Sequence, residues 1–447
     1  MTSRAYGRYA ASVTDDGQQS QTVRRLPAWP LILLFGFYPF WWAVGVVDVI
    51  RIPVGALMAM QMFRAGTLQA PRGFGIWLLF LLWAGCSGIM LGSAGDLIGF
   101  TYRYLLYIAA TSLFIYVYNG REALTSRAVS GMMTCWWLTT VIGGYLGILF
   151  PAGVIRTPMS YLLPAGLQSN ELVNHMVIRR LAQYNSESSL QLEPRPSAPF
   201  LYTNNWGNVY SLLLPFVLVY LIEVRGERRY PWLLAMLPIS AVPAALTLNR
   251  GMFVGIGIAI AYVVLRLLIL RRFRAVGGLV ALAALGLLLF QLLPTQERLA
   301  NRLGGDTGTN STRSSLYLQS LELVPESPIF GLGGPQPSSG VEQPPVGTQG
   351  QLWMLLVSHG PIATALFTGW FILVFLRTRR RTDPMSLAAG TIILVGTVEL
   401  LYYGILPNGL PIMMVATAMA LRPPQGSRQG APAAQTGSAH SLTAIGS

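Results

Sequence analysis

Long apolar runs recur along the whole chain and alternate with short polar segments that contain arginine. A transmembrane helix needs about 20 apolar residues and a membrane barrel strand only about 10, so runs of this length predict helices. The predicted fold is an all-α, polytopic integral membrane bundle of about twelve transmembrane helices. The predicted spans lie near residues 28–47, 49–63, 74–94, 98–118, 128–150, 206–223, 231–248, 251–270, 275–293, 351–376, 385–404 and 408–421.

The polar segments define the predicted organisation of the chain. Residues 1–27 form an N-terminal segment, residues 28–421 the bundle, and residues 422–447 a disordered tail. Two connections, 151–205 and 294–350, are much longer than the others, and long loops inside a compact bundle are usually functional. We expect a short helix at "NELVNHMVIRRLAQY" in the first loop and an amphipathic helix, ended by prolines, from "NSTRSSLYLQSLE" in the second.

The short connections carry most of the positive charge, and this charge predicts the orientation of the chain. Arginine clusters such as "RGERR" and "RTRRRT" all fall on one side of a twelve-span chain, and positive residues are enriched in cytoplasmic loops. Both termini are then cytoplasmic, and both long loops lie on the outer face. Membrane orientation explains the formal net charge of +14, so we expect membrane lipid and no nucleic acid among the partners.

Arg250 stands between two apolar runs, 231–248 and 251–270. A charge inside hydrocarbon costs several kcal/mol, so this arginine needs an explanation. It is either an interfacial side chain that reaches lipid headgroups or part of a site that holds an anion. Gly251 and Gly255 form a face of small residues that permits close helix packing, which favours an orientation into the bundle.

Arg313 is predicted to lie in the first turn of the helix in the second long loop. A positive side chain there adds to the positive end of the helix dipole, which is unfavourable unless an anion is bound. A solvated arginine at a frayed helix end explains the pattern equally well. An outer face rich in arginine and poor in paired acids suits binding of a phosphate or diphosphate through guanidinium groups, without a metal.

Three more ionisable side chains, His359, Glu399 and Arg103, fall inside predicted spans. Such residues are functional candidates by default, although packing or ion pairing within the bundle is their commoner role. Asp48 and Arg51 share a turn and are placed to pair with each other. No HExxH motif and no acidic pair of the Mg²⁺-binding kind occurs on the outer face, so we expect neither a metal site nor a cofactor.

Three segments, in this order, resemble the O-antigen ligase and polymerase superfamily of membrane glycosyltransferases. "RPSAPFLYTNNWGN" is similar to the family's segment ahead of a span, "TLNRGMFVG" to its Ser-Arg-Gly at the head of a span, and "TRSSLYLQSLELVPESPIFGLG" to its arginine-led helix ending in Pro-x-x-Gly-x-Gly. Ala198 and Pro199 replace the usual Gly-Thr, and Asn249 replaces the serine. The matching positions are Arg195, Phe200, Asn204, Gly207, Arg250, Gly251, Arg313, Glu322, Pro328, Gly331 and Gly333.

The family's fourth element is altered in this chain. It is a His-Asn pair that leads into the span after the large loop, and the corresponding position before Gly360 is Gln349. His359 stands directly before this glycine, three helical turns further into the span. The resemblance therefore leaves two candidates, Gln349 and His359, for the role of the family histidine.

The resemblance covers residues 195–376 and implies a ligase-like core at the outer face of the bacterial cytoplasmic membrane. The implied donor is a glycan on a polyprenyl diphosphate such as undecaprenyl diphosphate, and the implied acceptor is a sugar of a growing polymer, a glycolipid or the cell wall. Arg250 and Arg313 would bind the diphosphate and stabilise the leaving group. Gln349 or His359 would orient or deprotonate the acceptor hydroxyl. The further candidates for substrate binding are Arg195, Asn204, Arg302 and Glu322.

Two other functions stay open at this stage. A transporter or a flippase for lipid-linked oligosaccharides predicts ionisable residues along a path through the membrane and an inverted repeat, and no convincing repeat is visible. An inactive, glycolipid-binding relative is suggested by the missing histidine. For the enzyme, we expect cell-envelope polysaccharide biosynthesis without a metal, and a groove between spans that admits the donor lipid sideways from the membrane.

Overall fold

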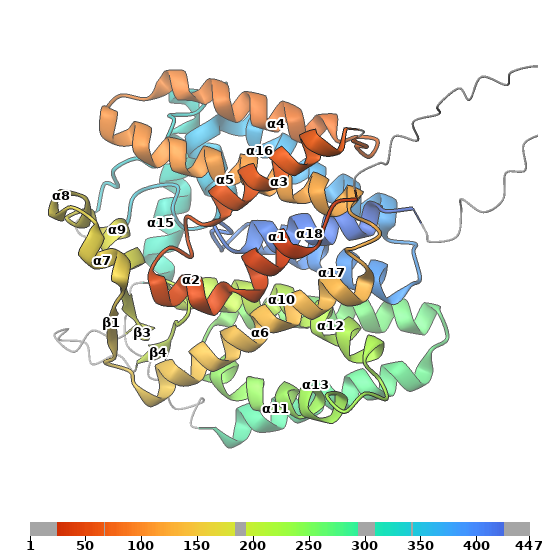
Figure 1. The fold of residues 1–447 in the computed structure, drawn as a ribbon. Coiled ribbons are helices and arrows are strands. Elements are labelled where there is room, and N and C mark those ends of the chain that lie inside the picture. The colour runs from red at the N-terminus through yellow and green to blue at the C-terminus, as the bar shows by residue number, and fades with distance from the viewer. Residues whose placement is uncertain (1–24, 67, 184–193, 294–308, 341–342, 424–447) are drawn as a thin grey trace, which may run out of the picture.

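The computed structural model describes residues 25–66, 68–183, 194–293, 309–340 and 343–423 (Figure 1). These residues are mostly helical, and each predicted apolar run contains a helix. The bundle comprises α1 (Trp29–Leu31), the π-helical turn η1 (Ile32–Gly36), α2 (Tyr38–Val44), α3 (Arg51–Ala65), α4 (Gly75–Cys86), the 3₁₀ turn η2 (Ser87–Met90), α5 (Ala94–Asn119), α6 (Ser126–Leu149), α10 (Thr203–Glu223), α11 (Tyr230–Leu246), α12 (Arg250–Ile269), α13 (Phe273–Leu292), α16 (Gln351–Thr378), α17 (Pro384–Glu399) and α18 (Gly409–Leu421).

Six of the described helices are long and apolar enough to cross a membrane: α5, α6, α10, α12, α13 and α16. Helices α11, α17 and α18, and α4 together with η2, are apolar but shorter. The first predicted span is divided among α1, η1 and α2, because the chain changes from α to π geometry at Ile32 and breaks at Phe37. A multi-pass helical membrane protein is therefore supported, and the count of twelve spans is not confirmed.

Helix α18 forms the centre of the bundle. Every residue from Gly409 to Ala420 is buried, and Figure 1 shows this helix between α4, α5 and α16 on one side and α6, α10 and α12 on the other. Helix α13 lies at the periphery and has no buried residue. Because α13 is about as apolar as the buried helix α18, its exposed surface suits contact with lipid.

The arginine-rich connections meet at one end of the bundle, where their side chains cap helix ends. Arg422 donates to the carbonyl oxygen of Val117, in the last turn of α5, and to that of Leu124, in the connection that follows this helix. Arg381 in turn donates to the carbonyl oxygen of Arg422. Carbonyls in the last turn of a helix lack intrahelical partners, and a guanidinium satisfies them. These arginines, predicted as orientation signals, also stabilise helix ends.

The first long loop departs from the all-α prediction. It contains two short antiparallel pairs of strands, β1 (Val154–Arg156) with β2 (Ile178–Arg180) and β3 (Ala182–Gln183) with β4 (Arg195–Pro196). Between β1 and β2 lie the short helices α7 (Pro158–Leu162), α8 (Ala165–Gln168) and α9 (Glu171–Val177). The helix expected at "NELVNHMVIRRLAQY" therefore ends at Val177, because the β-branched Ile178 and the arginines after it pair with β1.

Asp48 does not pair with Arg51, contrary to the sequence-based prediction. Its carboxylate accepts from Arg179 of β2 at 2.9 Å, and both side chains are almost completely buried. Arg51 instead donates to the carbonyl oxygen of Val47 and to Oδ1 of Asn408. The buried ion pair thus ties the first long loop to the turn before α3.

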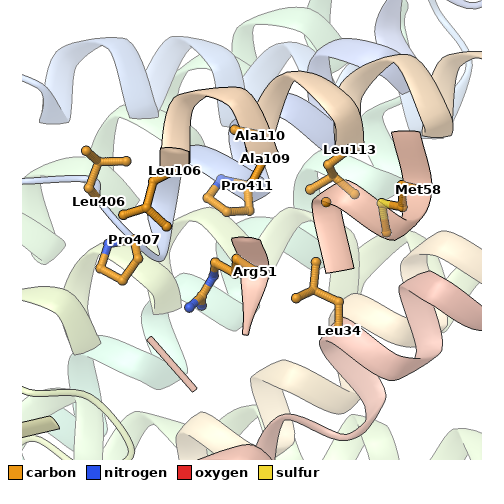
Figure 2. A pocket seen from close by; sticks show the side chains of 11 residues that line it. Leu34, Arg51, Met58, Leu106, Ala109, Ala110, Leu113, Leu406, Pro407 and Pro411 are labelled. Carbon is orange, nitrogen blue, oxygen red and sulfur yellow. The ribbon is translucent and has the colours of Figure 1, made fainter. Parts of the chain in front are cut away.

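A small cavity lies beside Arg51. Figure 2 shows Arg51 among the apolar side chains that line it, which come from η1, α3, α5 and the segment that leads into α18. Its volume is about 10 Å³, which is roughly the space of one water molecule. The cavity is too small for a substrate, so Arg51 has a structural role in the bundle.

Candidate active site

Arg250 is the first residue of α12, directly after the turn from α11. Its side chain is exposed and makes no hydrogen bond or ion pair within the described residues. Gly251 and Gly255 are the positions where α12 contacts the end of α17. A Cβ on Gly251 would lie 2.7 Å from the Tyr403 hydroxyl, and one on Gly255 would lie 2.2 Å from Oε1 of Glu399. The small face therefore packs against α17, while the guanidinium beside it stays accessible instead of entering the core.

The residue before Arg250 holds the helix head in place. Asn249 is buried, its Nδ2 donates to the carbonyl oxygen of Thr203 at 3.1 Å, and its Oδ1 accepts from the Tyr403 hydroxyl. A Cβ on Gly207 would lie 2.2 Å from Nδ2 of Asn249, so only glycine fits there. The asparagine that replaces the family serine thus fills a space between α10 and the end of α17.

Arg195 of β4 contacts the same turn. Its Nε donates to the carbonyl oxygen of Thr247 at 2.6 Å, two residues before Asn249. Asn204 lies in the first turn of α10, partly exposed, next to the Thr203 carbonyl that Asn249 contacts. The first motif therefore supports the head of α12, although its residues precede Arg250 by more than forty positions in the chain.

Arg313 lies on α15 (Thr309–Glu322), in the second long loop. The sequence predicted Arg313 in the first turn of this helix. The helix begins four residues before Arg313, so the arginine lies just beyond the first turn. The effect of the helix dipole fades within the first turn, so the dipole argument for an anion at Arg313 is weaker than the sequence suggested. The side chain is partly exposed and is without a hydrogen bond or ion pair in the part of the chain that the structure describes.

Tyr317, one turn after Arg313, fastens α15 to the bundle. Its ring stacks on Trp353 with centroids 4.5 Å apart, and its hydroxyl donates to the carbonyl oxygens of Gln349 and Leu401. Burial raises the pKa of the Tyr317 phenol, and the charge of Arg313 acts in the opposite direction. The phenol is therefore protonated at neutral pH, as a donor to two carbonyls must be.

Two other candidates on the second loop are not placed in the site. Glu322, the last residue of α15, is exposed. Arg302 lies outside the described residues.

The Pro-x-x-Gly-x-Gly segment lies against a break in α16. Gly360 has φ 81° and ψ 172°, and Pro361 follows, so the helix is interrupted there. The N–H groups of Leu332 and Gly333 donate to the freed carbonyls of Val357 and Ser358 at 2.8 and 2.9 Å. Gly331 has φ 67°, and a Cβ on it would lie 2.5 Å from the backbone nitrogen of Gly360. Glycine is therefore required for the loop to reach the helix.

We expect Gly331→Ala to detach the second long loop from α16. The new methyl group overlaps the backbone of Gly360, and the left-handed φ angle is unfavourable for alanine. Limited proteolysis within 309–340 should then become faster than in the unaltered protein. Gly277→Ala in α13, where a Cβ meets open space, is the matched control and should leave the rate unchanged. An unchanged rate for Gly331→Ala would contradict this account of the motif.

The two candidates for the family histidine lie in different environments. Gln349 is partly exposed just before α16 and next to Tyr317. His359 is 1% exposed, and its Nδ1 lies 2.6 Å from Oγ of the buried Ser87. Gln349 is therefore accessible from outside the bundle, whereas His359 is enclosed by η2, α5 and α16.

The segment Leu401–Tyr403, after α17, joins these parts. The Leu401 carbonyl accepts from Tyr317 of α15 and from Nε1 of Trp353 in α16. The Tyr402 hydroxyl donates to the Gly251 carbonyl, and Tyr403 contacts Asn249. The helices that carry Arg250 and Arg313, and the start of α16, are therefore attached to the same three residues.

An apolar cavity of about 500 Å³ lies between α10, α11, α12 and α13. Its lining is almost entirely aliphatic and aromatic, with Tyr210, Ser211 and Thr391 as the polar exceptions. Phe253 lines it from α12 and lies three residues after Arg250, a spacing that places two residues on one face of a helix. The cavity thus extends along α12 to within one turn of Arg250, while its other lining residues on α12, Ile256, Ala259, Ile260 and Val263, lie on a different face of the helix from Arg250.

Comparison with known proteins gives one match. Residues 234–353 match the family model described as O-antigen ligase. This range runs from α11 to the start of α16 and includes Arg250, Arg313 and Gln349, but not Arg195, Asn204 or His359. No curated protein and no solved structure matches the chain.

Proposed function

We propose that this chain moves a glycan from a polyprenyl-diphosphate donor to an acceptor sugar, since residues 234–353 match the O-antigen ligase family model. The family supports a membrane glycosyltransferase of the ligase or polymerase type. We place its active site at the outer face of the bacterial cytoplasmic membrane, where both long loops would lie, in the synthesis of a cell-envelope polysaccharide. Neither a metal nor a cofactor takes part in the proposed reaction.

One observation carries the proposal. Arg250 and Arg313, on two different helices, lack a carboxylate partner among the described residues, and both helices are attached to Leu401–Tyr403. Two guanidinium groups on one side of an anion form paired, charge-assisted hydrogen bonds, which suit a diphosphate. We assign the diphosphate to these two arginines, with Arg195 and Asn204 supporting the head of α12 from the first loop.

The apolar cavity between α10, α11, α12 and α13 suits the lipid part of the donor. A polyprenyl chain is a branched hydrocarbon, and the apolar lining of the cavity matches it without unpaired polar groups. With the tail in this cavity, the diphosphate would lie near the head of α12, where Arg250 is. We propose that this cavity serves as the groove between spans that sideways entry from the membrane requires.

The proposed reaction is a single displacement at the anomeric carbon of the donor glycan. The acceptor oxygen forms a bond to this carbon, the bond from the carbon to the diphosphate oxygen breaks, and the polyprenyl diphosphate leaves with the electron pair. Negative charge therefore increases on the diphosphate, and Arg250 and Arg313 stabilise it. The acceptor hydroxyl loses its proton to a base or to water.

Gln349 is better placed than His359 to act on the acceptor. An amide does not take up a proton at neutral pH, so Gln349 would orient the hydroxyl by a hydrogen bond. His359 faces Ser87 inside the bundle and would reach the acceptor only after movement of the loop that covers the break in α16. We therefore assign orientation to Gln349 and keep His359 as the alternative base.

Glycan transfer by the reconstituted protein tests this function. The purified chain in proteoliposomes, supplied with an undecaprenyl-diphosphate-linked glycan and an acceptor glycan, should release undecaprenyl diphosphate and form a new glycosidic bond. Release of the diphosphate without a new glycosidic bond would mean hydrolysis, and an absence of both products would favour an inactive binding relative.

Filling the apolar cavity should affect long donors selectively. Gly286 lines the cavity on α13 with open space around it, so Gly286→Trp places an indole where the lipid would lie. We expect the KM for an undecaprenyl-linked donor to rise while that for a short prenyl donor changes little. Gly278→Trp, on the same helix but outside the cavity lining, is the control. An equal change for both donor lengths would contradict this location of the lipid.

The break in α16 at Gly360 supports a flippase or transporter as the second candidate function. Interrupted helices beside buried polar groups are typical of transporter sites, and His359 lies at such an interruption. Movement of a fluorescent lipid-linked oligosaccharide across proteoliposome membranes, without any glycosidic bond formed, would support this function and exclude the ligase.

A further inference from the structure

The hydroxyl groups of Tyr402 and Tyr403 contact both neighbours of Arg250. Tyr403 donates to Oδ1 of Asn249, and Tyr402 donates to the carbonyl oxygen of Gly251 at 3.2 Å. Gly251 has no side chain, so these two rings occupy the space beside it. The position of Arg250 on the surface of the bundle is therefore set by two phenol groups from a distant part of the chain.

Tyr403 also contacts the start of α16. Its carbonyl oxygen accepts from the backbone N–H of Gln351 at 2.7 Å, and the Leu400 carbonyl accepts from Leu352 at 2.9 Å. Gln349 lies two residues before Gln351. One buried residue, 2% exposed, thus fixes the head of α12 through its hydroxyl and the start of α16 through its backbone.

We propose that Tyr403 is a positioning residue that holds Arg250 in register with Gln349 for the diphosphate donor. The inference rests on the proposed function, since it assumes that Arg250 binds the diphosphate. Without the hydroxyl, the Asn249 oxygen loses its donor in a buried place, and the turn from α11 to α12 relaxes. The guanidinium of Arg250 then samples positions from which it does not reach the diphosphate.

A double-mutant cycle between Tyr403→Phe and Arg250→Ala tests this role. The measurement is the affinity of the detergent-purified full chain for undecaprenyl diphosphate, with undecaprenyl monophosphate as the second probe. We expect Tyr403→Phe to weaken diphosphate binding by on the order of tenfold, the scale of one lost hydrogen bond to a buried group. In the Arg250→Ala background the same change should have almost no further effect, because the positioned group is absent.

The control separates positioning from general stability. Tyr262→Phe removes a hydroxyl from the same helix, α12, where the phenol makes no hydrogen bond within the described residues, and it should leave binding unchanged. Monophosphate binding by Tyr403→Phe should fall less than diphosphate binding. Equal losses in both Arg250 backgrounds, or no loss in either, would overturn the positioning role. Unchanged diphosphate binding by Arg250→Ala alone would instead overturn the proposed function.

Discussion

Replacing Arg250 or Arg313 by alanine is expected to lower the rate of glycan transfer by a factor on the order of 10²–10³, the usual effect of removing one group that stabilises charge in the transition state. Both side chains lack a carboxylate partner among the described residues, so neither variant leaves a buried charge unpaired. The thermal unfolding of each variant in detergent should therefore match that of the unaltered protein. The measurement is the initial rate of transfer in proteoliposomes at saturating acceptor.

Arg156→Ala is the matched control for both variants. Arg156 is an exposed arginine of the first long loop that has no ion pair in the described part of the chain. Its removal should leave the rate of transfer unchanged. A full rate for Arg250→Ala, or an equal loss for all three variants, would contradict the assignment of the diphosphate to Arg250 and Arg313.

Of the substitutions considered, removal of the Asp48 carboxylate should produce the largest loss of unfolding free energy. Asp48→Ala leaves Arg179 charged and without a partner, while both positions are almost fully buried. Breaking a buried pair in this way costs about 3–5 kcal/mol of unfolding free energy. We expect a clear drop in the midpoint of unfolding in detergent, accompanied by faster proteolysis of the first long loop, which β2 anchors through this pair.

Two variants check that the loss arises from an unpaired buried charge. Adding Arg179→Met to Asp48→Ala removes the charge and should restore most of the stability. Glu122→Ala breaks the exposed pair with Arg25 and should change stability by only about 0–1 kcal/mol. If Asp48→Ala were no more destabilising than Glu122→Ala, the ion pair between Asp48 and Arg179 would not anchor the first long loop.

The helices and the resemblance to the O-antigen ligase family were predictable from the sequence because their signals are local. An apolar run long enough to span a membrane is visible in any one segment, and each predicted span contains a helix. The family resemblance rested on short motifs, and the match over residues 234–353 confirms it for that range. Whether all of these helices cross the membrane depends on tilt and neighbours, which no single segment reports.

Pairings between distant residues were not predictable in the same way. Asp48 was assigned to Arg51 because they share a turn, yet its partner lies 131 residues away in a strand that was predicted to be helical. The contacts of Tyr402 and Tyr403 with α12 span about 150 residues and follow no motif. Such contacts depend on how helices pack, and a hydrophobic pattern specifies only which face is apolar.

The glycines of the family motif illustrate a signal whose meaning required the structure. Gly331 and Gly333 were recognised by their spacing after Pro328, without a physical reason for glycine. The reason is the break at Gly360, since the loop satisfies backbone groups that an interrupted helix leaves free inside the bundle. His359 lies at this break, directly before Gly360, with its Nδ1 2.6 Å from Oγ of Ser87.

The central claim is that Arg250 and Arg313 together bind the diphosphate of a lipid-linked donor. The most direct measurement is an experimental structure of the full chain in a lipid nanodisc with undecaprenyl diphosphate bound. The account predicts that both guanidinium groups lie about 3 Å from diphosphate oxygens, with the prenyl chain entering the cavity between α10 and α13. A diphosphate bound away from both arginines, with the cavity empty of lipid, would contradict it.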